Sequence, residues 1–476
     1  MLAMSDGIRL IYVDLDRTLV RIDLLRERLL LAILRRPSIF FLALFWLWKG
    51  GRARLKVEVA QRCPLDVANL PFNEELFALL KKKRHHGQEL VLATAAPHGW
   101  AQAIADYLGI FDRVLATDSA NGNLKGRRKL AKILEDAKGK PFGYAGDSHS
   151  DRPIFEAAEL PIVVGRNASL AGKHAGKAVV IHQRIRTARS WIKSLRPYQW
   201  SKNVLIFTPV IAAHRLDQIW PNAILAFVVF SLVASAFYLM NDFCDIDLDR
   251  QHPDKRWRSQ AIGALCPSHA LFMAGALLFA ATVITSHLSY KYNIILLCYG
   301  VTNLLYSVTI KKVVVMDLMT LAFLYTLRVL AGGAACHVFV SQWLFSFIFF
   351  LALSLAHLKR YTELTQRVQR GLGSGARPTY NVSDMALLMK VGLGAGLISV
   401  LILALYVTSP QTVSVYKTPD LLFVVCVFLF YWIERMWFWA SRERISGDPI
   451  VFMVTDPVSY FIGAATLGLV WIATVY

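Results

Sequence analysis

The sequence is poor in cysteine, with six in 476 residues, and none of them stands in a CxxC motif or a Cys/His pattern with zinc-site spacing. We therefore expect neither a disulfide framework nor a zinc site. Acidic residues are also few, with 33 Asp and Glu against 53 Lys and Arg, which gives a formal charge of +20. The basic residues are scattered between apolar segments and do not gather with aromatic residues on one face. We expect no nucleic-acid partner, and favour anionic lipid headgroups and phosphorylated substrates.

The first residues, MLAMSDGIRLIYVDLD, lack the apolar core and cleavage site of a signal peptide, so we expect the N-terminal part to stay in the cytosol. Apolar residues, in contrast, are abundant. They make up 55% of the chain, and the mean hydropathy is +0.42. This composition is too apolar for an ordinary soluble protein and predicts that part of the chain lies in a membrane.

Up to residue 185, short apolar runs alternate with charged helical stretches. The runs IRLIYVDL, ELVLATAA, KPFGYAGDS and LPIVVG are candidate parallel strands, because strands covered on both faces read as short continuous apolar runs. We predict a Rossmann-like α/β domain over residues 1–185, with a helical cap inserted at about residues 20–85.

Long apolar segments follow, and several could span a hydrocarbon layer of about 30 Å. They lie near residues 203–213, 222–240, 269–287, 291–310, 313–335, 342–357, 386–408, 420–437 and 450–476. We predict an all-α membrane domain of about nine transmembrane helices over residues 186–476. If the N-terminal domain is cytosolic, most loop Lys and Arg residues fall on the cytoplasmic side, which obeys the positive-inside rule. A multi-pass protein of the cytoplasmic (inner) membrane is expected, with its active sites on the cytoplasmic side.

Residues suited to phosphoryl transfer follow several of the predicted strands. VDLDRT, ATAAP, NLKGRRK and GYAGDSHSD supply Asp14, Asp16, Thr94, Lys125, Asp147 and Asp151. A phosphoryl-transfer site needs a carboxylate nucleophile, a second carboxylate for acid/base work, a hydroxyl and an ammonium for the phosphate, and acids for Mg²⁺. Four such elements in this order form a specific pattern.

These motifs resemble the haloacid dehalogenase superfamily of phosphatases, over roughly residues 8 to 170. The resemblance implies that Asp14 is the nucleophile and Asp16 the general acid/base. It makes Thr94 and Lys125 phosphate ligands and places Mg²⁺ on the acids Asp14, Asp16, Asp147 and Asp151. Arg17 stands where the family often has Gly. The alternative is a domain that keeps the fold but has lost turnover.

Within the predicted cap, the stretch SIFFLALFWLWKGG is too short to span a bilayer and fits a buried or interfacial helix. It could form the core of the cap. Alternatively, Phe40, Phe41, Phe45, Trp46 and Trp48 could rest on the membrane and bring the cap to a lipid-linked substrate.

An aspartate-rich segment, NDFCDIDLDRQHPDKRWR at residues 241–258, directly follows an apolar run. On a helix continuing from the membrane, the spacing of three and four puts Asn241, Asp242, Asp245 and Asp249 on one side. Such a cluster is suited to holding Mg²⁺ against a diphosphate, with Lys255, Arg256 and Arg258 meeting phosphate oxygens. The alternative is a solvated acidic loop.

The pattern NDxxDxxxD resembles the aspartate-rich motif of the UbiA superfamily of intramembrane prenyltransferases. YSVTIKKVVVMDL matches the second motif, with Tyr306, Lys311, Lys312 and the metal-site residue Asp317. The resemblance covers about residues 194 to 476 and implies a UbiA-like helical fold. Most members carry a second DxxxD, but here Leu321 follows Asp317 at that spacing. This departure argues against a prenyl diphosphate donor.

Further segments, LRPYQWSKN, HPDKRWR, LRVLAGG and HLKRYTEL, resemble the decaprenyl-phosphate phosphoribosyltransferase branch. That branch implies transfer from phosphoribosyl diphosphate (PRPP) to a polyprenyl phosphate, with Lys202, Arg328, Lys359 and Arg360 among the phosphate-binding residues. The phosphatase would then remove the 5-phosphate to leave polyprenylphosphoryl ribose. The rival interpretations are a UbiA enzyme that moves a prenyl group to an aromatic acceptor and a transporter. The sequence leaves the lipid chain length and the oligomeric state open.

Overall fold

The computed structural model describes residues 8–118, 122–165, 168–182, 188–213, 216–369, 380–445, 449–453 and 455–475. The chain forms two compact units. The first unit contains Met1–Arg196 and Tyr238–Ala276, and the second contains Pro197–Phe237 and Leu277–Tyr476. The aspartate-rich segment thus belongs to the same unit as the N-terminal α/β fold.

A six-stranded parallel sheet forms the centre of the first unit, in the order β3-β2-β1-β4-β5-β6. The strands are β1 (Leu10–Val13), β2 (Glu89–Pro97), β3 (Arg113–Thr117), β4 (Phe142–Gly146), β5 (Leu160–Val164) and β6 (Val179–Ile181). The four predicted runs form β1, β2, β4 and β5. The α/β fold class is confirmed, and β3 and β6 are additions.

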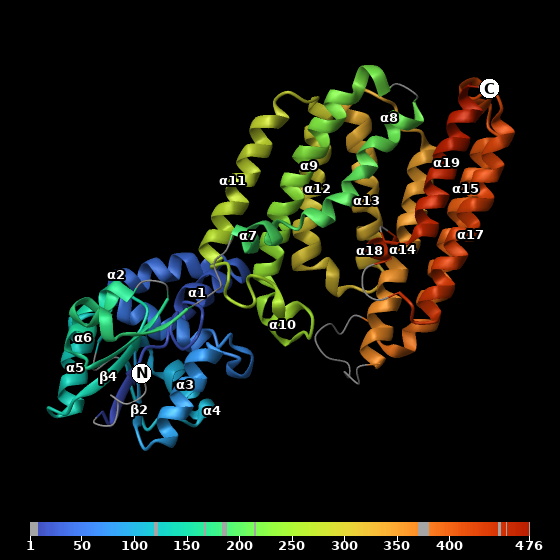
Figure 1. Cartoon of the computed structure of the whole chain (residues 1–476). Helices are drawn as coiled ribbons and strands as arrows, with labels where there is room; N and C mark the ends of the chain where they lie inside the picture. The colour runs from blue at the N-terminus through green and yellow to red at the C-terminus, as the bar shows by residue number, and fades with distance from the viewer. Residues whose placement is uncertain are drawn as a thin grey trace. The chain divides into compact units, whose positions relative to one another are not determined.

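Helices cover both faces of this sheet, as Figure 1 shows. Along β1, Ile11 and Val13 pack into one buried cluster, whereas Leu10 and Tyr12 pack into another. The first cluster includes residues of α3 and α4, and the second includes residues of α5 and α6. Burial on both faces explains the continuous apolar run of β1. The carboxyl end of β1 is thereby fixed from both sides.

The helical elements of the first unit follow the chain order. They are α1 (Leu24–Arg35), α2 (Ser38–Arg62), η1 (Val67–Asn69), α3 (Glu74–His85), α4 (His98–Leu108), α5 (Arg127–Ala137), η2 (His149–Asp151), α6 (Arg152–Ala157), η3 (Ala168–Lys177), α7 (Ala188–Leu195), α10 (Ile246–Gln251) and η5 (Lys255–Trp257). Helices α1 to α3 lie between β1 and β2, where the cap insert is predicted. Asp23 and Asn73 cap α1 and α3 with side-chain oxygens, which satisfies free N–H groups at each start.

Helix α2 is kinked at Gly50 and Gly51, where Gly51 has a positive φ of 63°. The half before the kink carries the predicted aromatic stretch. In it Trp46 is buried in the core, but Phe41 is 71% exposed and Trp48 is 84% exposed. Most of the stretch is therefore not cap core in this unit; only Trp46 and Ala43 of its apolar side chains are buried.

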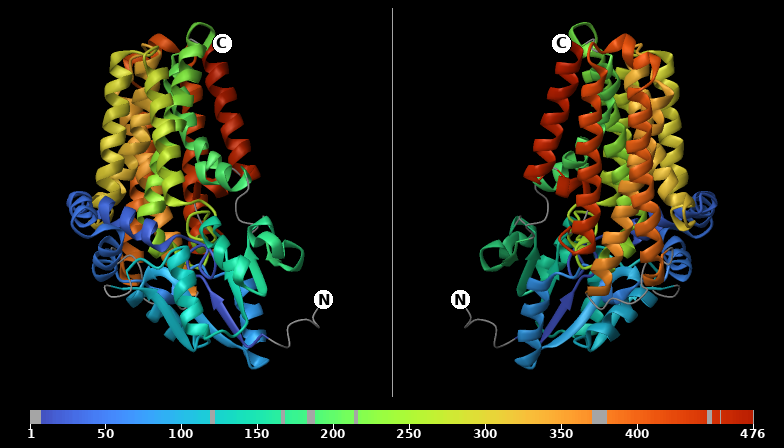
Figure 2. Two further views of the ribbon diagram at one scale, coloured as in Figure 1. Left: turned by 90° about the vertical axis from the view of Figure 1, so that its left-hand side faces the viewer. Right: turned by 90° about the vertical axis from the view of Figure 1, so that its right-hand side faces the viewer.

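The second unit is helical, and its long helices run side by side (Figure 2). Helices α9 (Leu216–Cys244) and α11 (Pro267–Thr285) extend from one unit into the other. The remaining elements are η4 (Pro197–Phe207), α8 (Thr208–Ala212), α12 (Tyr290–Val308), η6 (Ile310–Lys312), α13 (Met316–Ala335), α14 (Gln342–Gln369), η7 (Val382–Asp384), α15 (Met385–Val407), α16 (Pro410–Val415), η8 (Pro419–Leu421), α17 (Leu422–Ser441), α18 (Pro449–Met453) and α19 (Pro457–Val475).

Seven helices among the described residues are long and apolar enough to cross a membrane. They are Trp220–Cys244, Pro267–Thr285, Met316–Ala335, Gln342–Gln369, Val382–Val407, Pro419–Ser441 and Pro457–Val475. The chain is a multi-pass membrane protein, but the predicted count of nine is not confirmed. Residues 203–213 form the end of η4 and the short α8, and residues 291–310 lie mainly in α12, which is not among the seven.

Close backbone packing in the second unit places η4 against α13. A Cβ on Gly332 would lie 1.9 Å from the carbonyl oxygen of Ile206, so only glycine fits there. This contact explains the first glycine of LRVLAGG, and a Cβ on the second, Gly333, would lie 2.5 Å from Val340. The packing of η4 on α13 also brings Asn203 to Arg328.

Candidate active sites

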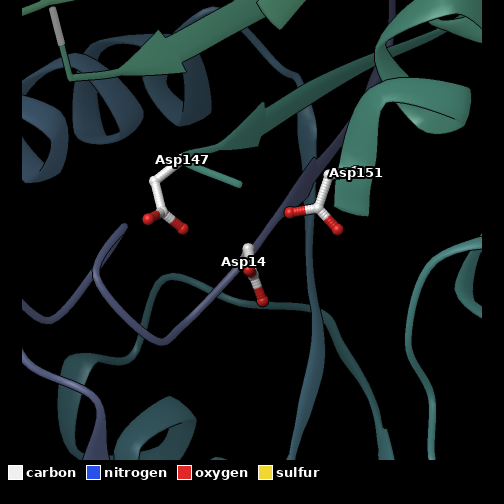
Figure 3. A group of neighbouring side chains, drawn as sticks. All are labelled: Asp14, Asp147 and Asp151. Atoms are coloured by element: carbon white, nitrogen blue, oxygen red, sulfur yellow. The ribbon is translucent and has the colours of Figure 1, made fainter. Parts of the chain in front are cut away.

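Three carboxylates converge at the carboxyl ends of β1 and β4 (Figure 3). Asp14 follows β1, Asp147 follows β4, and Asp151 ends η2. One oxygen from each lies within 4.8 Å of the other two, which is close enough for one metal ion. Among the described residues, this is the group of three or more potential ligands with that spacing. Hard carboxylate oxygens suit Mg²⁺, so the donor set fits the predicted ion.

The lysine beside Asp14 is Lys129, not the predicted Lys125. Lys129 Nζ lies 3.0 Å from Asp14 Oδ1 and 3.5 Å from Asp151 Oδ1, and its side chain is 3% exposed. It also donates to the Tyr144 hydroxyl at 2.9 Å. Lys125 lies exposed in the loop before α5. The two carboxylates raise the pKa of Lys129 above its usual value, although burial acts against them. Lys129 therefore stays charged.

Asp16 lies beyond the three converging carboxylates, in the loop between β1 and α1. Its Oδ1 accepts a hydrogen bond of 2.9 Å from the Leu24 N–H. Burial, followed by the negative charge of Asp23, raises the pKa of Asp16 to about 7. A carboxyl group that exchanges its proton near neutral pH suits general acid/base work.

Burial and neighbouring charges also shift the pKa values of Asp147 and Asp151. Burial raises the pKa of Asp147 to about 6, and Arg17 opposes the shift from 3.4 Å. Burial raises the pKa of Asp151 as well, against the effect of Lys129. A cation placed among these acids would relieve the cost of their charges. Arg17 has a φ of 58°, the left-handed region that glycine favours, which fits the family's frequent Gly at this position.

Two further side chains lie at the end of β2. Thr94 is fully buried, and its Oγ1 accepts from the Ala96 N–H at 3.0 Å. Lys56, from the second half of α2, donates to the Ala95 carbonyl at 2.5 Å and to Asn123 Oδ1 at 2.7 Å. Burial lowers the pKa of Lys56, partly offset by Asp16 and Asp23. The segment predicted to be the cap insert thus contributes a lysine that the sequence motifs do not reveal.

The sequence predicts one helix that continues from the membrane span through the aspartate-rich segment, but the structure has a break there. Helix α9 ends at Cys244, and α10 begins at Ile246 with Asp245 as its N-cap. The Asp245 N–H still donates to the Asn241 carbonyl at 2.9 Å, and the Asp249 N–H donates to the Asp245 carbonyl at 2.8 Å. The i to i−4 hydrogen bonds that join Asn241, Asp245 and Asp249 thus continue across the break.

Arginines hold two of these aspartates. Arg258 Nη1 donates to Asp242 Oδ1 at 3.0 Å and to Asp249 Oδ2 at 2.6 Å. Arg196 also forms an ion pair with Asp242. Burial raises the pKa of Asp249, and Arg258 opposes this rise. The Arg258 guanidinium therefore bridges Asp242 and Asp249, and Asp242 has Arg196 as a second cationic partner.

In the second unit, Asp317 is fully buried and is paired with Arg360, another predicted site residue. Arg360 Nε and Nη2 both lie 3.0 Å from Asp317 Oδ2, and the Tyr380 hydroxyl donates to Oδ1 at 2.6 Å. Arg360 also contacts Tyr306, whose hydroxyl accepts from Nη2 at 3.2 Å. Glu363 accepts from Arg360 Nη1 at 2.7 Å. Tyr380 was not singled out from the sequence, whereas Glu363 lies in HLKRYTEL, one of the segments that carry the resemblance.

Arg328 occupies a separate buried cage in the same unit. Its Nε donates to Asn203 Oδ1 at 2.9 Å, and Nη2 donates to the Tyr299 hydroxyl at 3.3 Å. Its guanidinium lies 5.2–5.4 Å from the ring centres of Phe230, Tyr299 and Tyr325. These rings stabilise the charge by cation–π contact. Lys202 Nζ lies 5.9 Å from the Tyr325 ring.

The remaining predicted phosphate ligands lie on two short 3-10 helices and on the long helix α14. Lys255 and Arg256 are in η5, where Arg256 stacks on Trp257 at 4.9 Å. Lys312 is exposed at the end of η6, and Lys359 is half-buried on α14. Their roles stay predictions.

Residues 204–455, more than half of the chain, match the UbiA prenyltransferase family. The chain belongs to this family. Residues 11–156 match the haloacid dehalogenase-like hydrolase family, so a domain of that type lies at the N-terminus. Both resemblances seen in the sequence are confirmed, and the chain is an enzyme by both of its parts.

Relatives cover the chain to different extents. It is 32% identical over 461 residues to the uncharacterized protein y4nM of Sinorhizobium fredii. The match covers 95% of this chain and 88% of y4nM. Nodulation protein NoeC of Azorhizobium caulinodans is 32% identical over 60% of this chain and 93% of its own length. Decaprenyl-phosphate phosphoribosyltransferase of Mycolicibacterium smegmatis is 36% identical over 36% of this chain, and the match spans only 56% of that protein.

Proposed function

We propose that this UbiA enzyme transfers 5-phosphoribose from PRPP to a polyprenyl phosphate, and that its N-terminal domain then removes the 5-phosphate. The observation that carries the proposal is the 36% identity between 179 residues of this chain and a protein named decaprenyl-phosphate phosphoribosyltransferase. The converging acids of the first unit add the phosphatase chemistry that such a product would call for.

In the transfer step, a phosphate oxygen of the lipid attacks C1 of the ribose. The new C1–O bond forms as the bond to the diphosphate breaks, and pyrophosphate leaves with the bonding electrons. Asp242, Asp245 and Asp249 would hold Mg²⁺, with Asn241 and Asp317 as further candidates. When bound, the ion neutralises charge on the leaving diphosphate. The bridging position of Arg258 fits this set, because Asp242 and Asp249 already share one cation.

The basic side chains would bind the two phosphate-bearing ends of PRPP. Lys202, Lys255, Arg256, Tyr306, Lys312, Arg328, Lys359 and Arg360 are the proposed ligands. A donor that carries a 5-phosphate as well as a diphosphate needs more cationic contacts than a prenyl diphosphate, and ionic hydrogen bonds are the strong ones.

In the hydrolytic step, Asp14 attacks the phosphorus of the 5-phosphate. The ribose 5-oxygen leaves and takes a proton from Asp16, whose raised pKa suits this transfer. Water then cleaves the aspartyl phosphate, with Asp16 as the base. Lys129 fixes Asp14 from 3.0 Å and would contact the phosphate, with Thr94 and Lys125 as further candidates. Asp147 and Asp151 would hold Mg²⁺ together with Asp14.

The test is to supply the purified full-length enzyme with Mg²⁺, polyprenyl phosphate and labelled PRPP, and to identify the lipid products by mass spectrometry. A ribosylated lipid supports the proposal. In a parallel incubation, labelled prenyl diphosphate and an aromatic acceptor replace these substrates. A prenylated aromatic product, with no ribosylated lipid, would favour the conventional UbiA reaction.

A further inference from the structure

A buried ion pair joins the cap insert to the aspartate-rich segment. Glu27 lies in the first turn of α1, and Arg250 lies in the last turn of α10. Arg250 Nη1 and Nη2 donate to the two carboxylate oxygens of Glu27, each at 2.8 Å. The Arg250 and Glu27 side chains are 4% and 0% exposed. The residues are far apart in the chain but belong to one compact unit.

The same two helices make further contacts around this pair. Arg28 Nη2 lies 2.8 Å from Asp247 Oδ1, and Arg35 adds a more exposed contact to the same carboxylate. Next to these pairs, Leu31 packs against Phe243 and Ile246. Polar contacts thus connect α1 to α10, and apolar contacts connect α1 to the start of α10 and to the end of α9.

The place of Arg250 is fixed from a third direction as well. Its Nε donates to the Ala261 carbonyl at 3.0 Å, while Glu27 takes the other two nitrogens. A bidentate pair sets orientation as well as distance. Removing one partner of such a buried pair leaves an uncompensated charge, so the arrangement tolerates little displacement of α10.

This fixed helix carries the proposed metal ligands of the transferase. Asp249 is the neighbour of Arg250 in the chain, and its N–H donates to the carbonyl of the N-cap Asp245 at 2.8 Å. A shift of α10 would therefore move both carboxylates. Outer groups that orient metal ligands commonly change metal affinity by about 10- to 100-fold when they are removed.

We propose that Glu27, a residue of the phosphatase's cap insert, is a positioning residue of the transferase. Through its bond to Arg250 it holds α10 and thereby the carboxylates of Asp245 and Asp249. The inference rests on the proposed function, because those two aspartates are proposed ligands of the transferase ion.

The experiment uses full-length protein in which Asp147→Asn weakens the phosphatase metal site. Binding of Mn²⁺ alone is measured by electron paramagnetic resonance, and the Mg²⁺ dependence of ribosyl transfer is measured in parallel. Glu27→Gln should weaken Mn²⁺ binding by about 10-fold and raise the apparent KM for Mg²⁺ by a similar factor. Arg35→Ala is the matched control: it removes the exposed partner of Asp247 and should change either quantity by less than about 2-fold.

A second variant separates positioning from stability. In Glu27→Leu/Arg250→Met, both buried charges are gone, so the thermal unfolding temperature should return toward that of the parent protein. Mn²⁺ binding should stay weak, because the bidentate ion pair that fixes α10 is absent. This variant also carries the test if Glu27→Gln fails to fold. Parental Mn²⁺ affinity in Glu27→Gln, or affinity that recovers together with stability in the double variant, would overturn the proposal.

The Mn²⁺ titration also keeps this inference apart from the proposed reaction. If the parent protein makes no ribosylated lipid from PRPP, the proposed function fails, whatever Glu27 does. If the parent transfers ribose but Glu27→Gln binds Mn²⁺ normally, the positioning role fails and the reaction stands.

Discussion

The two proposed sites keep their acidic residues in different states. At the phosphatase site, Asp14, Asp147 and Asp151 converge with their oxygens within 4.8 Å, in an arrangement that already fits a metal ion. In the aspartate-rich segment, Arg258 lies between Asp242 and Asp249, and in the second unit Arg360 holds Asp317. All three phosphatase acids contact a cation, Lys129 or Arg17, and they still converge with one another. Asp242, Asp249 and Asp317 of the proposed transferase site are each paired with an arginine, which substrate and metal would have to displace.

This difference in charge pairing also affects how each site would bind a phosphorylated substrate. An arginine that leaves a carboxylate can turn to a phosphate, so the cation that holds the empty transferase site could become a ligand of its substrate. The phosphatase acids have only Lys129 and Arg17 as near cationic partners among the ion pairs of the described residues. The following predictions test whether the two sites act as separately as their electrostatics suggest.

The largest expected effect is that of Asp14→Asn. Loss of the nucleophile should reduce phosphatase turnover by at least about 1,000-fold. Ribosyl transfer should continue, because Asp14 takes no part in forming the glycosidic bond, so the 5-phosphorylated lipid should accumulate. Mass spectrometry of lipids made from PRPP and polyprenyl phosphate checks this. Dephosphorylated lipid at the wild-type level would show that the phosphatase serves another substrate.

The reverse experiment is Asp249→Ala. Removing a proposed metal ligand should reduce ribosyl transfer by at least about 100-fold, since this site has few acids to replace it. Hydrolysis of a soluble phosphomonoester should stay within about 2-fold of wild type. Both rates are measured on the same preparation. Wild-type transfer by this variant would remove Asp249 from the metal site.

A matched pair of lysines sharpens the account of the phosphatase. Lys129→Met should lower the turnover of a soluble phosphomonoester by about 100-fold, because it removes the cation 3.0 Å from Asp14. Lys125→Met should lower the same turnover by less than about 3-fold, because Lys125 lies in an exposed loop where solvent screens its charge. Steady-state kinetics distinguishes the two. A larger loss for Lys125→Met would return the phosphate-binding role to the residue first predicted from the motif.

The smallest expected effect concerns the exposed aromatic half of α2. Trp48→Ser should lower hydrolysis of the lipid-linked phosphate in vesicles by about 3-fold, because an interfacial tryptophan favours the headgroup layer. Hydrolysis of a soluble phosphomonoester should not change. Tyr107→Ser is the control, since Tyr107 is 55% exposed on α4 of the same unit. Equal losses for both substrates would mean that Trp48 supports the cap and not its contact with a membrane.

Much of the fold could be predicted because it follows short periodic patterns. The runs that form β1, β2, β4 and β5 are continuous and apolar, whereas β3 begins with Arg113 and β6 has only three residues, Val179–Ile181. Neither short strand has a pattern that separates it from a loop. Residues 203–213 are apolar enough to suggest a span, but they divide between η4 and α8.

The site residues that were missed depend on orientation and on distant contacts. Lys129 could have been found, because it shares a spacing of four with Ile133 and Ala137, the buried face of α5. A lysine in an apolar stripe indicates a buried partner. No such signal existed for Tyr380, which reaches Asp317 from a segment 63 residues away. Glu27 likewise has the appearance of an ordinary first-turn acid on α1.

The buried pair of Glu27 and Arg250 has a consequence for how such a chain could be divided or inherited. A protein cut after residue 185 would lose Arg250, the bidentate partner of Glu27, and would leave Leu31 without Phe243 and Ile246. A gene for the phosphatase alone would need compensating substitutions on α1 before its product was stable. Recombination that exchanged one half for that of a distant relative would meet the same obstacle. This contact makes the two parts of the chain depend on each other for stability, which joint expression alone would not require.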